Sequence, residues 1–505
     1  MDLSRLIERN AAFAPEKPAL VFDGAPTSYG TFAGRIAACA GALSGLGIGK
    51  GDRVAILSLN RPDYLVLLYA CARLGAILVP MNWRLAVPEQ LFILSDAEVK
   101  LLVLEQAFAA VLPSYAQALP GAAAVGLDFL PDSGFLLEEL LASAPPAPPP
   151  AGTLSDPLLI VYTSGTTGRP KGAVLAQEAL FANGVMSQHM HGLTGEDHVL
   201  TVLPFFHVGG LNIQTTPALH QGATVTIHAR FAPDTTLAAI AETRPTLTVL
   251  VPATMQALTA HPGWAGADLS SLRAVTTGSS IVPQGLIDAF SARGVPVLQV
   301  YGATETCPVA VYTRLGGDLS RKGSTGLPGL LCEARIVGED GAECPPGIAG
   351  EILVRGPNVL TRYWRNPTAT AEALHDGWFR TGDIGTRDGD GYVTVHDRRK
   401  NMIISGGENI YPAEIERVLT AHPGVQDAAV IGRPDPKWQE VPVAYVLPHP
   451  AQAEDEAALR LALIAVLEAN LARFKLPREI VFVADLPRTA LGKVQHFRLK
   501  QERER

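Results

Sequence analysis

The stretch Leu158-Leu-Ile-Val-Tyr-Thr-Ser-Gly-Thr-Thr-Gly-Arg-Pro-Lys-Gly172 joins an apolar run of β character to a loop of glycine and hydroxyl residues. Glycine lets backbone amides approach an anion, Ser and Thr add donors, and Lys171 adds a positive charge. The loop is therefore predicted to bind phosphate, although by itself it could also be an ordinary turn after a strand. It is not a Walker A loop, because Pro170 stands in place of the second glycine and Gly172 in place of the metal-binding Ser or Thr.

The surrounding sequence indicates an α/β protein. Apolar runs of β type, such as residues 53–58, 76–80 and 99–104, alternate with helical patterns such as residues 62–74. This alternation predicts layered helices and mostly parallel sheets. After Gly350 the strands become shorter and turns more frequent. At 505 residues the chain is expected to form more than one domain.

Composition excludes several classes of protein. A net charge of −8 argues against general nucleic-acid binding, and five scattered Cys indicate a reducing compartment without a structural zinc site. The N-terminus lacks the pattern of a signal peptide. The longest apolar run, residues 64–81, is interrupted by Arg73 and Gly75, so we expect a buried helix and strand rather than a membrane span. A cytoplasmic enzyme is the default expectation.

Three further motifs carry polar side chains suited to nucleotide chemistry. Residues 300–306, Val-Tyr-Gly-Ala-Thr-Glu-Thr, offer an aromatic face at Tyr301 and a carboxylate at Glu305 that suits magnesium. Residues 376–385 present Asp383 beside a glycine, where a carboxylate can accept hydrogen bonds from both ribose hydroxyls. Residues 486–494 place Lys493 after a glycine in a turn. Taken alone, each motif could be a turn or a solvated charge.

Together and in this order, the four motifs resemble those of the adenylate-forming family, which comprises acyl-CoA synthetases, luciferases and peptide-synthetase adenylation domains. The resemblance covers almost the whole chain. It implies a large N-terminal AMP-binding domain over residues 1–397, built of layered α/β sheets with a β-barrel-like subdomain. A hinge over residues 398–400 and a small mobile α+β domain over residues 401–505 follow.

The resemblance also assigns roles to individual residues. Catalytic roles fall to Lys493, Thr304, Glu305 and His207, and Glu305 is in addition the magnesium ligand. Lys493 matches the family's catalytic lysine, whose cation offsets the charge repulsion when a carboxylate attacks the α-phosphate of ATP. Cofactor-binding roles fall to Thr163, Ser164, Gly165, Thr166, Thr167, Gly168, Lys171, Ser279, Tyr301, Gly302, Ala303, Asp383, Arg398, Lys400, Ser405, Gly406 and Gly407. Of these, Lys400 matches the hinge residue, and residues 405–407 belong to a loop that lines the thiol channel.

The predicted activity is that of an ATP-dependent acid:CoA ligase that releases AMP and pyrophosphate. Its cofactors are ATP, Mg²⁺ and coenzyme A, its partner is a small-molecule carboxylic acid, and the family is often monomeric or dimeric. No nucleic acid and no integral membrane segment are expected. Two alternatives remain: an adenylation enzyme that loads a carrier protein, although residues 203–214 lack the acidic side chain that an amino-acid substrate needs, and a catalytically dead paralogue that binds nucleotide or acyl-CoA.

The acid itself is the least determined part of the prediction. Ser279 and Ser280 replace the Gly-Ala that the family often has at the wall of the acyl pocket. An apolar pocket with few hydrogen-bonding groups suits a medium-chain fatty acid or an aromatic acid of the cinnamate or benzoate kind. A dicarboxylic acid would need a cation, for which Arg273 is the candidate. The expected lining residues are His207, Gly210, Gln214, Gly278, Ser279, Gly302, Cys307, Pro308 and Val309.

Overall fold

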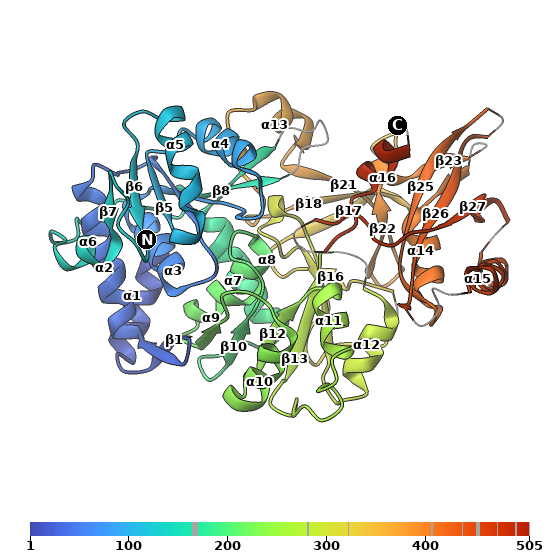
Figure 1. Cartoon of the computed structure of the whole chain (residues 1–505), viewed down its shortest axis with the longest axis horizontal. Helices are drawn as coiled ribbons and strands as arrows, with labels where there is room; N and C mark the ends of the chain where they lie inside the picture. The colour runs from blue at the N-terminus through green and yellow to red at the C-terminus, as the bar shows by residue number, and fades with distance from the viewer. Residues whose placement is uncertain are drawn as a thin grey trace.

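The computed structural model describes residues 1–163, 170–279, 282–321, 323–405, 408–436, 438–450, 455–471, 473–489 and 492–503. The first part of the chain forms two large sheets with helices between them and on both outer faces (Figure 1). A smaller antiparallel sheet follows, and the C-terminal part forms a separate α+β unit beside it (Figure 1). The predicted α/β class and the small α+β C-terminal part are thus confirmed.

The first large sheet is parallel in its centre and antiparallel at both edges. In spatial order its strands are β16 (Leu327–Pro328), β15 (Val311–Tyr312), β14 (Val297–Tyr301), β13 (Ala274–Gly278), β12 (Leu247–Leu250), β10 (His198–Thr201), β11 (Thr224–Ile227), β1 (Pro18–Phe22) and β2 (Ala25–Ser28). Because the carboxyl ends of parallel strands meet at one edge, β13 and β14 deliver Gly278 and Tyr301 side by side.

The second large sheet carries the quoted stretch. In spatial order its strands are β19 (Arg362–Tyr363), β9 (Lys171–Ala176), β8 (Pro157–Thr163), β4 (Ile77–Pro80), β3 (Arg53–Leu57), β5 (Leu101–Leu104), β6 (Ala123–Gly126) and β7 (Phe135–Leu136). The loop predicted to bind phosphate connects β8 and β9, which are antiparallel and pair Thr163 with Lys171.

The main core lies between these two sheets. Apolar side chains of α2 (Tyr29–Gly45), α3 (Pro62–Leu74) and α7 (Gln177–His191) pack there against both of them. Helix α3 is buried on all sides, as its uninterrupted apolar sequence predicts, and it leads into β4. None of the described helices is both long and apolar enough to cross a membrane.

Other helices cover the outer faces of the sheets. Helices α4 (Val87–Asp96) and α5 (Leu112–Ala118) cover the second sheet, and α10 (Pro233–Thr243), α11 (Pro252–Thr259) and α12 (Gln284–Ser291) cover the first. The remaining helical segments of this part are α1 (Ser4–Phe13), η1 (Gln106–Val111), α6 (Leu137–Ala142), α8 (Val208–Gly210), the π-helix η2 (Leu211–Thr215), α9 (Thr216–His220), η3 (Thr304–Thr306) and α13 (Pro367–Ala373).

The smaller antiparallel sheet lies mostly after Gly350, where the sequence predicts shorter strands. It consists of β17 (Glu333–Val337), β18 (Gly350–Arg355), β21 (Trp378–Arg387) and β20 (Leu374–His375), with β22 (Val393–Arg398) on β21. The 3₁₀ turn η4 (Arg399–Asn401) then leads to the C-terminal unit. Its elements are β23 (Ile403–Ser405), β24 (Glu408–Ile410), α14 (Pro412–Thr420), β25 (Val425–Asp435), β26 (Gln439–Pro448), α15 (Glu456–Asn470), η6 (Arg473–Lys475), β27 (Glu479–Phe482) and α16 (His496–Arg503).

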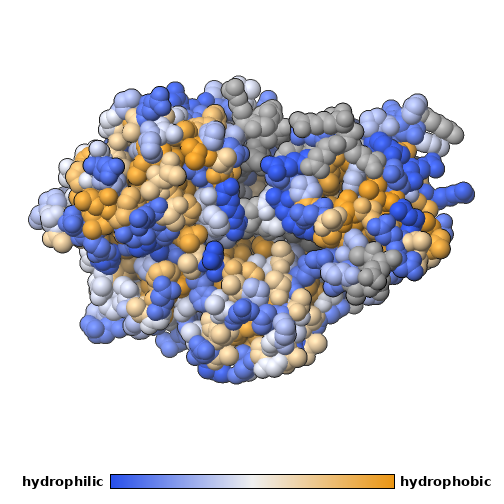
Figure 2. Space-filling view, in the orientation of Figure 1, coloured by the Kyte–Doolittle hydropathy of each residue, from blue (hydrophilic) through white to orange (hydrophobic). Residues whose placement is uncertain are grey.

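The C-terminal unit lies against α11 of the first part. The side-chain amide of Gln256 in α11 donates to the carbonyl of Gln426 at 3.3 Å. A Cβ atom at Gly492 would stand 2.8 Å from the Cβ of Ala253, so the turn before Lys493 touches the start of the same helix. These contacts place the turn before Lys493 at the start of α11, which follows the carboxyl end of β12. In Figure 2 the surface is hollowed between the first part and the C-terminal unit, with hydrophilic side chains along the hollow.

Candidate active site

Tyr301, Asp383 and Arg398 form one hydrogen-bonded group at the end of β14. The hydroxyl of Tyr301 donates to Oδ2 of Asp383 at 2.9 Å. Arg398 Nε lies 3.2 Å from Oδ1 of the same carboxylate, because β21 and β22 pair these two residues directly. The pKa of the Tyr301 hydroxyl is raised by its own burial and by the neighbouring charge of Asp383. The hydroxyl therefore stays protonated and keeps donating at neutral pH. Tyr301 and Asp383, predicted from separate motifs, thus share one site with Arg398, which the family resemblance assigned.

A second group surrounds Glu305 in η3. The hydroxyl of Tyr363 donates to Oε1 of Glu305 at 2.8 Å, and the ammonium group of Lys171 lies 5.6 Å from the centre of the Tyr363 ring. The backbone amide of Leu360 also donates to the Glu305 carbonyl at 2.7 Å. Tyr363 comes from β19, which pairs with β9 beside Lys171. The predicted cation and carboxylate therefore flank one aromatic ring, whose contribution the sequence did not reveal.

Lys493 lies close to the first group. Partial burial, followed by the neighbouring positive charge of Arg398, lowers the pKa of Lys493 below its usual value, and Asp383 and Asp397 oppose this shift. The backbone around Lys493 is fixed by its amide, which donates to the hydroxyl of Thr489 at 3.1 Å. Lys493 is thus a cation held beside Asp383, although more than 100 residues separate them in the sequence.

His207 caps the short helix α8. Its Nδ1 atom accepts a hydrogen bond from the amide of Gly209 at 3.1 Å, so the ring proton is on Nε2. Burial lowers the pKa of His207 to about 4, so the imidazole is neutral at physiological pH. A neutral His207 can donate one hydrogen bond through Nε2 or present an uncharged wall to a substrate.

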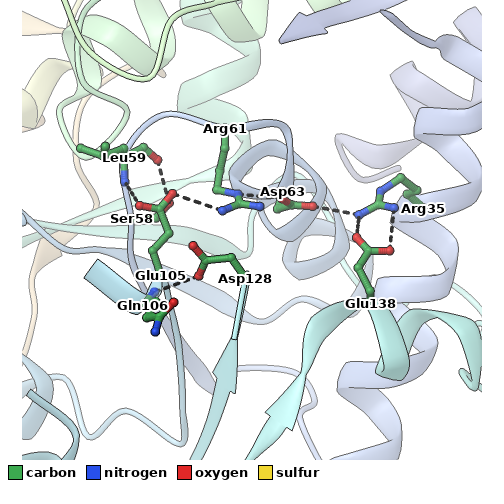
Figure 3. Close-up of polar contacts among 9 residues, drawn as sticks. All are labelled: Arg35, Ser58, Leu59, Arg61, Asp63, Glu105, Gln106, Asp128 and Glu138. Atoms are coloured by element: carbon green, nitrogen blue, oxygen red, sulfur yellow. Dashed lines mark hydrogen bonds and ion pairs between the residues drawn. The ribbon is translucent and has the colours of Figure 1, made fainter. Parts of the chain in front are cut away.

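Asn60 positions the segment that carries His207, and no sequence motif pointed to it. Its amide donates to the carbonyl of Leu203 at 2.8 Å, and its side-chain oxygen accepts from the amide of Phe205 at 2.7 Å. The loop that carries Asn60 is itself held by a chain of ion pairs (Figure 3). That chain runs from Glu105 through Arg61, Asp63 and Arg35 to Glu138.

Two backbone features shape the space between these groups. Ser279 follows β13 with φ of 71°, a left-handed conformation that is uncommon outside glycine and is often found at functional sites. At Gly302 a Cβ atom would stand 1.6 Å from the carbonyl oxygen of Pro308, so only glycine fits there. Ala303 and Thr304 follow directly, and the Thr304 side chain is almost entirely buried. Close backbone packing therefore requires the glycine of the Tyr-Gly-Ala-Thr-Glu stretch.

The segment predicted to form the hinge, residues 398–400, borders the site. Asp397 accepts hydrogen bonds from Asn401 and from the amide of Ala413 at the start of α14, each at 3.0 Å. Arg399 lies 3.7 Å from Glu351, which also pairs with Arg380. A cleft of about 890 Å³ opens here, lined by both arginines, Glu351, Lys171 and Tyr363 among others. Lys400 is exposed within η4.

The other predicted residues lie next to different elements or outside the described residues. Ser405 ends β23 and pairs with Glu408 and Gln439 inside the C-terminal sheet. Thr163 ends β8, and its hydroxyl donates to the carbonyl of Lys171 at 3.4 Å. Ser164, Gly165, Thr166, Thr167, Gly168, Ser280, Gly406 and Gly407 lie outside the described residues. Arg273 precedes β13, at the strand end away from the site, and pairs with Asp197 at 2.5 Å.

The polar site and the two-part fold together agree with one family of enzymes. Residues 7–364 match the model of the AMP-binding enzyme family, and residues 414–493 match the model of its C-terminal domain. The chain therefore belongs to the AMP-binding enzyme family, and the predicted membership of the adenylate-forming enzymes is confirmed.

Among curated relatives, the chain is 49% identical to the indoleacetate–CoA ligase of Aromatoleum aromaticum, over 99% of this chain and 98% of the relative. It is 41% identical to the feruloyl-CoA synthase of an Amycolatopsis species, over 96% of both chains. A crystal structure of the anthranilate CoA ligase AuaEII with anthranoyl-AMP superimposes with a TM-score of 0.93 and 28% identity, over 99% of this chain and 97% of that one. These proteins place the chain in the acid–thiol ligase branch.

Proposed function

We propose that the chain is an ATP-dependent CoA ligase for an aromatic carboxylic acid, acting through an acyl-AMP intermediate. The observation that carries this proposal is the convergence of Tyr301, Asp383, Arg398 and Lys493 beside the pair of Glu305 and Tyr363. The relatives named for indoleacetate, ferulate and anthranilate favour an aromatic acid.

In this proposal the nucleotide is held by the first group. Asp383, oriented by Tyr301 and Arg398, accepts hydrogen bonds from the ribose hydroxyls, and the ring of Tyr301 contacts the base. Lys171 and the loop before it bind the outer phosphates. Lys493 supplies a cation where the acid's carboxylate oxygen bonds to the α-phosphorus and pyrophosphate leaves, which lowers the barrier electrostatically.

Glu305 fits a magnesium ion. The described residues include no cluster of three or more His, Cys, Asp or Glu side chains suited to a metal. Magnesium commonly binds through one or two carboxylates together with substrate phosphates, so a single oriented carboxylate is what such a site requires. The ion would neutralise charge on the phosphates, and Tyr363 would hold Glu305 in the orientation that binds it.

In the second half-reaction the sulfur of CoA bonds to the acyl carbon, AMP leaves with the bonding electrons, and the thiol proton is released. Rotation of residues 401–505 about Lys400 would bring Ser405 and residues 406–407 to the site in place of Lys493. The assignment of residues 1–397 and 401–505 as the two moving bodies belongs to this proposal. Engagement of Arg273 by Asp197 speaks against a dicarboxylic acid.

The test is a pyrophosphate-release assay with ATP, magnesium and CoA on panels of aromatic, medium-chain fatty and dicarboxylic acids. We expect the highest kcat/KM on an aromatic acid, with acyl-CoA and AMP formed in equal amounts. A preference for fatty acids would reject the substrate class. Pyrophosphate release without CoA consumption would point to a carrier protein as acceptor, and no release on any acid would reject ligase activity.

A further inference from the structure

A buried polar network connects α7, η2 and β13. In the sequence, η2 directly follows the segment of residues 203–210 that carries His207, called the His207 segment below. Gln214, in the π-helix η2, is 1% exposed, and its side-chain amide donates to the hydroxyl of Thr276 at 3.2 Å. That hydroxyl lies 2.8 Å from Nε2 of His191, and Nδ1 of His191 lies 2.8 Å from the carbonyl of Ser187. Short π-helical segments are often found at functional sites.

The hydrogen atoms in this network can be assigned from its chemistry. The carbonyl of Ser187 only accepts, so Nδ1 of His191 must carry the ring proton. Burial lowers the pKa of His191 to about 4, so the ring carries only that one proton at neutral pH and Nε2 is an acceptor. The hydroxyl of Thr276 must therefore donate to His191 and can only accept from Gln214. This fixes the amide nitrogen of Gln214 toward Thr276 and its oxygen Oε1 on the other side.

Oε1 of Gln214 has no hydrogen-bond partner among the described residues. A buried carbonyl oxygen without a partner costs free energy, and most such groups in folded proteins are satisfied. The side chain of Asn212, two residues earlier in η2, contacts the sulfur of Cys307 at 3.5 Å. Cys307 follows Glu305 and Thr306 in the sequence. The bond to Thr276 places Gln214 between the His207 segment and β13, which ends at Gly278, a residue expected to line the acid pocket.

We propose that Oε1 of Gln214 accepts a hydrogen bond from an N–H or O–H group on the ring of the acid, and that Gln214 thereby determines specificity. This inference rests on the proposed aromatic-acid ligase function. A site that holds a buried acceptor favours the substrate that satisfies it and discriminates against an analogue that leaves it unpaired. The relatives' names agree, since indoleacetate carries a ring N–H and ferulate a ring O–H.

The test compares acids of the same shape with and without the donor. For wild-type protein we expect kcat/KM for indole-3-acetate to exceed that for benzofuran-3-acetate by about 10- to 100-fold. A second pair, 4-hydroxyphenylacetate and 4-fluorophenylacetate, distinguishes a phenolic donor from an indole donor. In Gln214→Met, which keeps the length but removes the acceptor, the ratio within the preferred pair should fall to near one.

Thr277→Val provides the matched control. Its hydroxyl is also buried without a partner among the described residues, but strand alternation places it on the opposite face of β13 from Thr276. This variant should retain the wild-type ratio. If wild-type protein converts both members of each pair equally well, Gln214 does not bind a donor group on the ring and the proposal is wrong. Conversion of aromatic acids in the same assay would still support the proposed ligase function. The wild-type comparison decides the question even if Gln214→Met does not fold.

Discussion

Tyr301 and Asp383 lie 82 positions apart in the sequence, yet the hydroxyl of one donates to the carboxylate of the other at 2.9 Å. The bond connects the last residue of β14, in the first large sheet, with β21 of the small antiparallel sheet. Arg398 holds the other oxygen of the same carboxylate. A carboxylate fixed on both sides is suited to bind a ribose with little loss of side-chain entropy.

Removal of this hydroxyl should weaken nucleotide binding. In Tyr301→Phe the ring remains but Asp383 loses one of its two partners, so we expect the KM for ATP to rise about 10-fold with a smaller change in kcat. The measurement is pyrophosphate release at varied ATP. Tyr115→Phe, which removes a hydroxyl bonded to the carbonyl of Ala123 in another part of the fold, serves as the control. An unchanged KM in Tyr301→Phe would mean that Asp383 does not bind the nucleotide.

The hydrogen bond from Tyr363 to Glu305 is expected to raise the affinity of the site for magnesium. Partners that orient a metal-binding carboxylate typically contribute about 10-fold or more to metal affinity. In Tyr363→Phe we therefore expect the magnesium concentration for half-maximal activity to rise about 10-fold, with activity recovered at high magnesium. A variant with unchanged magnesium dependence would argue that Glu305 does not hold the ion.

The hinge can be tested at Lys400. It stands early in η4, where proline is tolerated because the amide has no partner within the turn, but proline fixes φ and so restricts rotation. In Lys400→Pro we expect adenylate formation close to that of the wild type and the transfer of a supplied acyl-AMP to CoA reduced about 10-fold or more. Equal effects on both half-reactions would show that the pivot lies elsewhere.

His191 predicts an acid-sensitive fold. Burial lowers the pKa of His191 in the folded protein to about 4, whereas the unfolded chain keeps the ordinary value of about 6.5. Between these two pH values His191 binds a proton in the unfolded chain but not in the folded protein. Stability contributed by neutral His191 is therefore present above about pH 6.5 and is lost as the pH falls, by about 2 kcal/mol at pH 5. Thermal melting at pH 7 and pH 5 measures this. His191→Gln should show a smaller decrease in melting temperature than wild-type protein, and an equal decrease would contradict the assignment.

Motifs identified Tyr301, Asp383 and Lys493 in the sequence, because each side chain is tied to a local glycine turn or strand end that can be recognised from residue types. Arg398 was assigned by the family resemblance alone. Their meeting point was implied by the family resemblance, and the structure supplies the distances. The layering of helices and sheets also followed from hydrophobic patterns, as the buried sequence of α3 illustrates.

Other contributions depend on long-range pairing and leave no local pattern. Tyr363 reaches Glu305 only because β19 adds to the edge of the second sheet beside β9. Asn60 clamps the backbone of Leu203 and Phe205 from a distant loop. The polarity of the Gln214 network depends on a carbonyl in α7 and on a strand hydroxyl. None of these side chains is distinguished by its neighbours in the sequence.

In the proposed mechanism one site carries out two half-reactions, and Lys493 serves only the first. The most direct measurement is Lys493→Ala, assayed separately for acyl-AMP formation from the acid and ATP and for transfer of a supplied acyl-AMP to CoA. We predict that adenylate formation falls about 10²- to 10³-fold, while transfer to CoA persists near the wild-type rate. Equal loss of both half-reactions, or retention of both, would contradict the account.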